Sequence, residues 1–177
     1  METSPQRFQR LLEPVHDRAV GFARSVCRSR ADGDDLFQEA LLRALEKLPG
    51  LRDDNAFRFW LYRVIISVHR NRYKRSFWRR FLPLDSEPAA PERSDEVGAA
   101  DRARLALAEL PHDQREAIVL FELEGWKVEE LADLHGVSVS AIKSRLVRGR
   151  QRLRTIYTRK FGIAALPQTD LLPGESR

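Results

Sequence analysis

The chain has 177 residues, of which 31 are basic and 26 acidic, giving a net charge of +5 and a pI near 9.8. This length suits one ordinary domain or two small ones, and the basic excess suggests a polyanionic partner. The single cysteine, Cys27, excludes an internal disulfide and a multi-cysteine zinc site. The amino terminus lacks the apolar core of a signal peptide and no run is apolar enough to span a membrane, so we expect a cytoplasmic protein.

Apolar residues recur at helical spacing from Phe8 to about Leu48 and predict two helices. The first stripe holds Leu11, Val15, Ala19 and Phe22, and the second holds Leu36, Phe37, Ala40, Leu41, Ala44, Leu45 and Leu48. We expect Asp32 or Asp34 to cap the second helix. Pro49 and Gly50 end it, and residues 51–55 form a short polar loop.

The second of these helices also has a polar surface, formed by Asp35, Gln38, Glu39 and Arg43. Asp35 and Glu39 are four residues apart, as in some metal sites, but no histidine or further carboxylate motif accompanies them. A solvated capping turn and a docking surface for a basic partner are the two interpretations of this face. We expect no metal and no cofactor.

A long helix is predicted from about Ala56 to Arg75 or beyond, in a stretch without any acidic residue. Its core positions are Phe57, Trp60, Leu61, Val64, Ile65 and Val68. Arginines and lysines alternate there with aromatic residues, a mixture that suits single-stranded nucleic acid because cations follow phosphates and rings stack on bases. Trp60 fits the core better than a base platform, whereas Tyr73, Phe77 and Trp78 are candidates either for exposure or for covering a neighbouring helix.

Proline, alanine and acidic residues dominate the segment 83–99, which has no helical periodicity and is predicted to be a flexible acidic linker. Helical segments follow at 104–110 and 114–123, and a tail begins at Gly162. No segment is a convincing strand. The predicted fold is therefore all-α, with two small helical domains joined by the linker.

The last helical segments predict a helix-turn-helix. Val128, Leu131, Ala132 and His135 follow helical periodicity, Gly136 can adopt the left-handed turn, and Ser138 or Ser140 can cap the next helix. The inward stripe of that second helix consists of Ile142, Leu146, Gly149, Leu153 and Ile156.

The opposite face of the second helix carries Ser140, Ser144, Val147, Arg148 and Gln151, flanked by Lys143, Arg152 and Arg154. Serine and arginine can hydrogen-bond to base edges in a major groove, and a valine methyl can pack on a thymine methyl. A solvated basic helix with one stray valine is the alternative, and the turn and the cap favour the DNA-binding interpretation.

Three segments in this order resemble an extracytoplasmic-function sigma factor, a bacterial promoter-specificity subunit of RNA polymerase. DDLFQEALLRAL is similar to the polymerase-docking helix of that family, FRFWLYRV to its promoter-melting helix, and LPHDQREAIVLFELEGWKVEELADLHGVSVSAIKSRLVRGRQRL to its DNA-reading carboxy-terminal domain. The resemblance implies a region 2 domain at 1–82, a linker at 83–100, a region 4 domain at 101–161 and a tail at 162–177.

The resemblance also implies roles for particular residues. The polymerase-docking set is Asp35, Leu36, Gln38, Glu39, Leu42 and Arg43, on a helix that Leu41 and Leu45 help to build. The set at the −10 element is Asp53, Asp54, Asn55, Arg58, Trp60, Arg63, Arg70, Tyr73 and Lys74, with residues 51–55 capturing a flipped base. The set at the −35 element is Ser140, Lys143, Ser144, Arg145, Val147, Arg148 and Arg152.

The implied protein is not an enzyme, binds core polymerase through its β and β′ subunits and promoter DNA, and is a monomer when free. An anti-sigma factor is a common partner in the family. The chain departs from the family pattern at Ser67, where an amide is usual, and in the unusually basic and aromatic run HRNRYKRSFWRRF, so its promoter sequence is expected to differ.

Parts of the sequence are also compatible with two other functions. A helix-turn-helix regulator would bind duplex half-sites as a dimer without polymerase. A metal-dependent nuclease would use Asp32, Asp34, Asp35 and Glu39, but the sequence has no phosphate-cradling glycine loop and no metal-ligand spacing.

Overall fold

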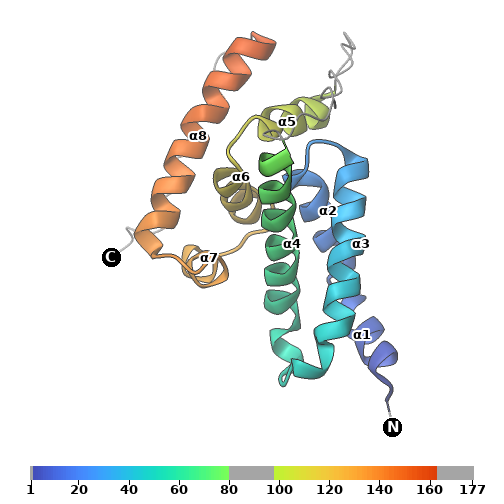
Figure 1. Ribbon diagram of the computed structural model, residues 1–177. Coiled ribbons are helices and arrows are strands. Elements are labelled where there is room, and N and C mark those ends of the chain that lie inside the picture. The colour runs from blue at the N-terminus through green and yellow to red at the C-terminus, as the bar shows by residue number, and fades with distance from the viewer. Residues whose placement is uncertain (1, 80–97, 163–177) are drawn as a thin grey trace.

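The computed structural model describes residues 2–79 and 98–162, and all regular structure in these ranges is helical (Figure 1). The amino-terminal part contains α1 (Ser4–Leu12), α2 (His16–Val26), α3 (Arg30–Lys47), two short 3-10 turns, η1 (Leu48–Gly50) and η2 (Asp54–Ala56), and α4 (Phe57–Arg79). The carboxy-terminal part contains α5 (Ala99–Ala108), α6 (His112–Ile118), the π-helical turn η3 (Val119–Leu123), α7 (Val128–His135) and α8 (Val139–Phe161). The all-α prediction is confirmed.

The amino-terminal domain is built on α2, α3 and α4, which pack along one another. Phe22, Leu36, Leu61 and Ile65 are fully buried between them, as the predicted apolar stripes require. The first predicted helix is wrong in one respect, because the chain breaks it into α1 and α2 at Pro14, which has no N–H to continue the helical ladder.

The start of α3 also differs from the prediction. Ser29, not Asp32 or Asp34, is the N-cap, and its hydroxyl oxygen accepts a hydrogen bond from the backbone N–H of Asp32 at 3.0 Å. The Ser29 hydroxyl in turn donates to the Asp32 carboxylate at 2.8 Å. The helix therefore begins three residues earlier than a cap at Asp32 would allow, and Asp34 instead pairs with Arg24 of α2 at 2.7 Å.

In the carboxy-terminal domain α7 and α8 form the predicted helix-turn-helix. Gly136 has a φ of 63°, which favours glycine, and Ser138 is the N-cap of α8, accepting from the backbone N–H of Ala141 at 3.2 Å. The predicted inward stripe of α8 is confirmed at Ile142, Leu146, Gly149 and Ile156, which are buried.

The two domains lie against each other. Helices α6 and α7 stand between α4 and α8, and α5 lies across the end of α2 (Figure 1). The predicted linker at 83–100 falls on residues outside the described ranges except at 98–100, where α5 has already begun at Ala99, and the tail lies outside them after Gly162. None of the described helices combines the length and the apolarity needed to cross a membrane.

Candidate polymerase and nucleic-acid interface

Helix α3 presents a mixed acidic and apolar face to solvent. Leu42 is 65% exposed, Leu45 is 37% exposed, and Asp35 and Gln38 are also at the surface. Leu42 and Leu45 are one helical turn apart and form a small apolar patch at the surface of α3. Leu36, in contrast, is fully buried in the core, because it lies on the opposite side of the helix.

Glu39 lies on the same helix and makes two ion pairs. Its carboxylate accepts from Arg43 one turn later at 2.7 Å and from Arg72 of α4 at 2.7 Å. Arg72 also donates to the backbone carbonyl of Asp35 at 2.9 Å. The polar face of α3 is thus fixed to α4, the helix predicted to hold DNA.

The loop between α3 and α4 is ordered by its own aspartates. The Asp53 carboxylate accepts from the backbone N–H and the side-chain amide of Asn55, at 2.9 and 3.0 Å. The Asp54 carboxylate accepts from Arg7 at 2.5 Å and from Arg10 at 2.9 Å, and these hydrogen bonds lower its pKa. Asp54 therefore anchors the loop to α1, whereas Asp53 and Asn55 remain exposed at its tip.

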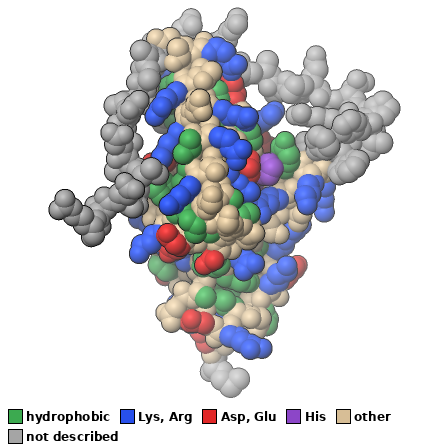
Figure 2. Space-filling view, turned by 90° about the vertical axis from the view of Figure 1, so that its left-hand side faces the viewer, with side chains coloured by type: hydrophobic (Ala, Val, Ile, Leu, Met, Phe, Trp, Pro, Cys, Tyr) green, Lys and Arg blue, Asp and Glu red, His purple; other side chains and the backbone are tan. Residues whose placement is uncertain are grey.

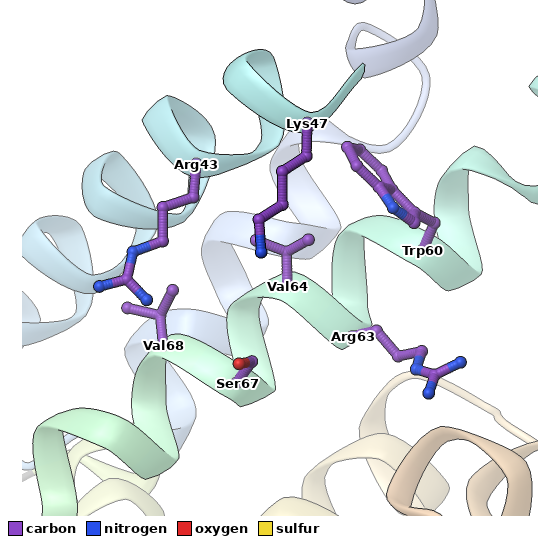
Figure 3. Close-up of a pocket in the computed structure, with 7 residues that line it drawn as sticks. All are labelled: Arg43, Lys47, Trp60, Arg63, Val64, Ser67 and Val68. Carbon is purple, nitrogen blue, oxygen red and sulfur yellow. The ribbon is translucent and has the colours of Figure 1, made fainter. Parts of the chain in front are cut away.

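A hollow of about 280 Å³ lies between α3 and α4 next to this loop (Figure 3). Its lining consists of Arg43, Lys47, Trp60, Arg63, Val64, Ser67 and Val68. Among the described residues, neither Lys47 nor Arg63 has an ion-pair partner. A partly exposed indole beside unpaired cations suits an unstacked base and its phosphate.

The residues that line the hollow come from different predicted sets. Trp60 and Arg63 belong to the predicted −10 set, but Arg43 was predicted to bind polymerase, and Lys47 was not predicted at all. Lys47 lies one turn after Arg43 on the same helix, a spacing that would have identified it once Arg43 was known to face α4.

Three other residues of the −10 set contact the carboxy-terminal domain. The Arg58 guanidinium lies 4.6 Å from the ring centre of Trp126. The Tyr73 ring stacks on His112 with centroids 4.6 Å apart. Arg70 donates to Nδ1 of His135 at 2.5 Å and lies 3.4 Å from a carboxylate oxygen of Glu116. Lys74, the next residue of the set, is exposed.

Glu116 is the centre of a buried charge cluster that the sequence did not predict. It is fully buried, accepts from Nδ1 of His69 at 2.7 Å, and lies 3.6 Å from Nδ1 of His135. Burial alone would raise the pKa of Glu116, but the hydrogen bond from His69 and the charges of His69 and Arg70 lower it, so the carboxylate is ionised. Burial lowers the pKa of His135 to about 4, and its neutral ring accepts the hydrogen bond from Arg70.

One signal for this cluster was available in the sequence. His135 occupies an apolar position of α7, and a buried histidine needs a polar partner. The partners themselves could not be named, since they lie on α4 and α6, far away along the chain.

The outward face of α8 is exposed, as predicted. Ser140, Lys143, Ser144, Arg148 and Arg152 are exposed, and Val147 is 54% exposed. Figure 2 shows Lys and Arg side chains spread over the side of the molecule on which α8 lies. Arg148 donates to the backbone carbonyl of Ser144 at 3.2 Å, which aligns it along the helix.

Arg145 differs from the other residues of the predicted −35 set. Its guanidinium lies 3.3 Å from the carboxylate of Asp113 on α6, and its side chain is only 19% exposed. It therefore braces α8 against α6. No group of His, Cys, Asp and Glu side chains in the described ranges is arranged to hold a metal ion.

These surfaces coincide with two known domain families. Sigma-70 region 2 matches residues 11–79, which include α2, α3 and α4, and Sigma-70 region 4 matches residues 100–153, which include α6, α7 and most of α8. SigM of Mycobacterium tuberculosis, an ECF RNA polymerase sigma factor, is 31% identical over 146 residues that cover 82% of this chain and 74% of SigM. The chain belongs to the ECF sigma factors.

Solved structures of sigma factors share its fold. The sigma factor RpoE of Bartonella quintana, in complex with the anti-sigma factor NepR, has a TM-score of 0.64 at 27% identity, over 86% of this chain and 98% of that one. CnrH, in complex with the cytosolic domain of CnrY, has a TM-score of 0.62 at 25% identity, over 86% and 88% of the two chains. In this sigma factor the region 2 match ends at the last residue of α4, and the region 4 match begins in α5.

Proposed function

We propose that this sigma factor binds core RNA polymerase through the exposed face of α3 and delivers it to promoters with two distinct elements. The observation that carries the proposal is the presence of two separate surfaces with exposed basic side chains, one on each domain, in the chain order of the family. One surface is the loop and hollow beside α4, and the other is the outward face of α8. A helix-turn-helix regulator would need only the second, and family membership does not favour it.

The amino-terminal surface suits the −10 element after its strands separate. Asn55 and Asp53 offer amide and carboxylate groups to the edge of a flipped base, and Trp60 offers a stacking face over the hollow. Lys47 and Arg63 neutralise the adjoining phosphates. Capture of unpaired bases offsets part of the free energy needed to open the duplex, and no covalent chemistry by the sigma factor is required.

The carboxy-terminal surface suits the −35 element as a duplex. The exposed row of α8 has the hydroxyl, guanidinium and methyl groups that read a major groove, from Ser140 to Arg152. Arg145 is left out of this proposal because Asp113 holds it. Leu36 is left out of the docking surface because it is buried.

The proposed partners are the β and β′ subunits of core polymerase, promoter DNA and an anti-sigma protein, the last because RpoE and CnrH were solved with such proteins. The protein would then act in the cytoplasm, where RNA polymerase binds the chromosome.

Run-off transcription with purified core polymerase on a genomic fragment library tests the function directly. We expect transcripts that require the sigma factor. Their start sites should lie downstream of shared promoter sequences. Specific duplex binding by the free chain, with no polymerase-dependent transcript from the same fragments, would contradict the proposal and revive the independent regulator.

A further inference from the structure

We propose that Arg72 is a positioning residue for polymerase binding, although it lies in the basic run of α4 that supplies several of the proposed DNA contacts. It holds the Glu39 carboxylate, and the turn of α3 that carries it, in the arrangement that core polymerase binds. This inference rests on the proposed function of α3. It also assigns Arg72 to the polymerase side of the molecule instead of to DNA.

Helical spacing directs the basic residues of this run to different sides of α4. Arg72 lies about 200° around the helix from Arg70, because each residue advances by about 100°. Arg70 contacts Glu116 and His135 of the carboxy-terminal domain, whereas Arg72 contacts α3. Lys74 is exposed. The cations of the run therefore differ in their partners, and a shared positive charge does not give them a shared function.

The Arg72 guanidinium contacts two positions that are one turn apart on α3. Its Nε donates to Oε2 of Glu39 at 2.7 Å, and its Nη2 donates to the backbone carbonyl of Asp35 at 2.9 Å. In an α-helix that carbonyl also accepts from the N–H four residues later, which is the N–H of Glu39. One arginine thus engages both ends of a single helical turn, and both ends belong to the proposed docking set.

The Glu39 carboxylate is held in place without being used up. Arg43 donates to its Oε1 at 2.7 Å, and Arg72 donates to its Oε2 at 2.7 Å. A carboxylate has about four lone-pair sites, so further donors can still bind to it. The Glu39 side chain is 29% exposed, and the remaining acceptor capacity is therefore accessible to a partner protein.

A carboxylate that is already fixed binds a partner at a lower entropic cost. A long side chain loses rotamer freedom when it is ordered at an interface, and this loss opposes binding. Arg43 lies on the same helix as Glu39, so it cannot fix the carboxylate relative to the rest of the domain. Arg72 lies on α4 and can do so.

Arginine suits this role better than lysine does. The two contacts use N–H groups at Nε and Nη2 of one planar guanidinium, whose donors have a fixed geometry. A lysine ammonium is a compact charge on a flexible chain. It could pair with Glu39, but it would not fix the turn at Asp35 in the same way.

Arg72→Met removes both contacts and keeps a long side chain that favours a helix. Arg75→Met is the matched control, because Arg75 lies one turn later on α4, is exposed, and has no ion-pair partner among the described residues. Both substitutions remove one positive charge, so a general effect of charge would change them equally. The full chain is used in every case, and circular dichroism verifies that helix content is retained.

Equilibrium titration of amino-terminally labelled sigma factor with core RNA polymerase, followed by fluorescence anisotropy, measures the Kd. Arg72→Met should weaken binding about fivefold, Arg72→Lys by a smaller factor, and Arg75→Met by less than about twofold. Glu39→Ala should weaken binding by itself. In that background Arg72→Met should cost less than about twofold more, because the carboxylate through which it acts is gone.

Unchanged or tighter binding by Arg72→Met would overturn the proposal, and tighter binding would mean that Arg72 screens Glu39. The same fivefold loss with and without Glu39→Ala would also overturn it, since Arg72 would then not act through Glu39. If Arg72→Met loses helix content, Arg72→Lys decides, and binding equal to wild type would count against the proposal. If Glu39→Ala leaves core binding unchanged, the proposed function of α3 is what fails.

Run-off transcription separates this role from a DNA contact. When the sigma factor saturates core polymerase, Arg72→Met should give the wild-type transcript yield, because only the affinity for core has changed. A lower yield at saturation would overturn the proposal by assigning Arg72 to DNA.

Discussion

The packing of α3 on α2 depends on a glycine at their closest approach, and this gives a prediction with a built-in control. A Cβ on Gly33 would lie 2.5 Å from Cα and 2.9 Å from the backbone nitrogen of Arg24. A Cβ on Gly21, in the middle of α2, would have nothing within 4 Å. Both residues are helical, so the same substitution is made with and without a clash.

Alanine is favoured over glycine in a helix by about 0.8–1.0 kcal/mol. Gly21→Ala should therefore raise the free energy of unfolding by about 0.5–1 kcal/mol. In Gly33→Ala the helices must separate by roughly 1 Å to restore ordinary contact, and overpacking of this kind costs about 1–3 kcal/mol. Since the propensity gain offsets only part of that cost, a net loss of up to about 2 kcal/mol is expected.

Urea unfolding of both variants, followed by circular dichroism, measures the difference. The midpoint should rise for Gly21→Ala and fall for Gly33→Ala at similar slopes. Equal stabilisation by the two substitutions would refute the reasoning, since it would mean that α2 and α3 do not approach as closely as the structure shows.

Three further predictions concern the surfaces. Glu39→Arg should abolish co-purification with core polymerase, because it reverses the charge that Arg43 and Arg72 share, and retained binding with native circular dichroism would contradict the docking role. Arg148→Ala should cost about 1–3 kcal/mol at one −35 position in a binding assay of promoter variants, whereas a uniform loss would identify a phosphate contact. Acid should destabilise the chain from near pH 6.5 downwards, because the unfolded chain protonates His135 there and the folded chain only near its lowered pKa of about 4. The loss should reach up to about 3 kcal/mol in urea midpoints between pH 7 and 4, and His135→Gln should flatten part of that profile.

Local signals in the sequence predicted the helix-turn-helix well. The positive φ at Gly136, the serine cap of α8 and its inward stripe each depend on residues within one or two turns of each other. The same kind of signal is present at the start of α3, because Ser29 and Asp32 have the spacing of a capping box. Pro14 likewise marked the break between α1 and α2.

Local sequence signals do not predict contacts between residues that are far apart along the chain. Glu116 has the sequence character of a surface residue, and its buried contacts are with His69 and Arg70 on α4 and His135 on α7. The hollow beside α4 could not be predicted for the same reason, because two of its lining residues, Arg43 and Lys47, lie on α3. Charge and spacing indicated which residues could contact DNA. They did not indicate which of these residues contact other side chains within the folded chain.

The sequence of α4 nevertheless indicates that two different sides of the helix are covered. The run from Leu61 to Val68 is apolar at nearly every position, and Tyr62, Val64, Ile65 and Ile66 are all buried. A helix with one covered face should alternate between apolar and polar at helical spacing, so a helix apolar on several sides must be covered on several sides. Helices α2 and α3 cover one side, and the carboxy-terminal domain covers another through Trp126 and Glu124.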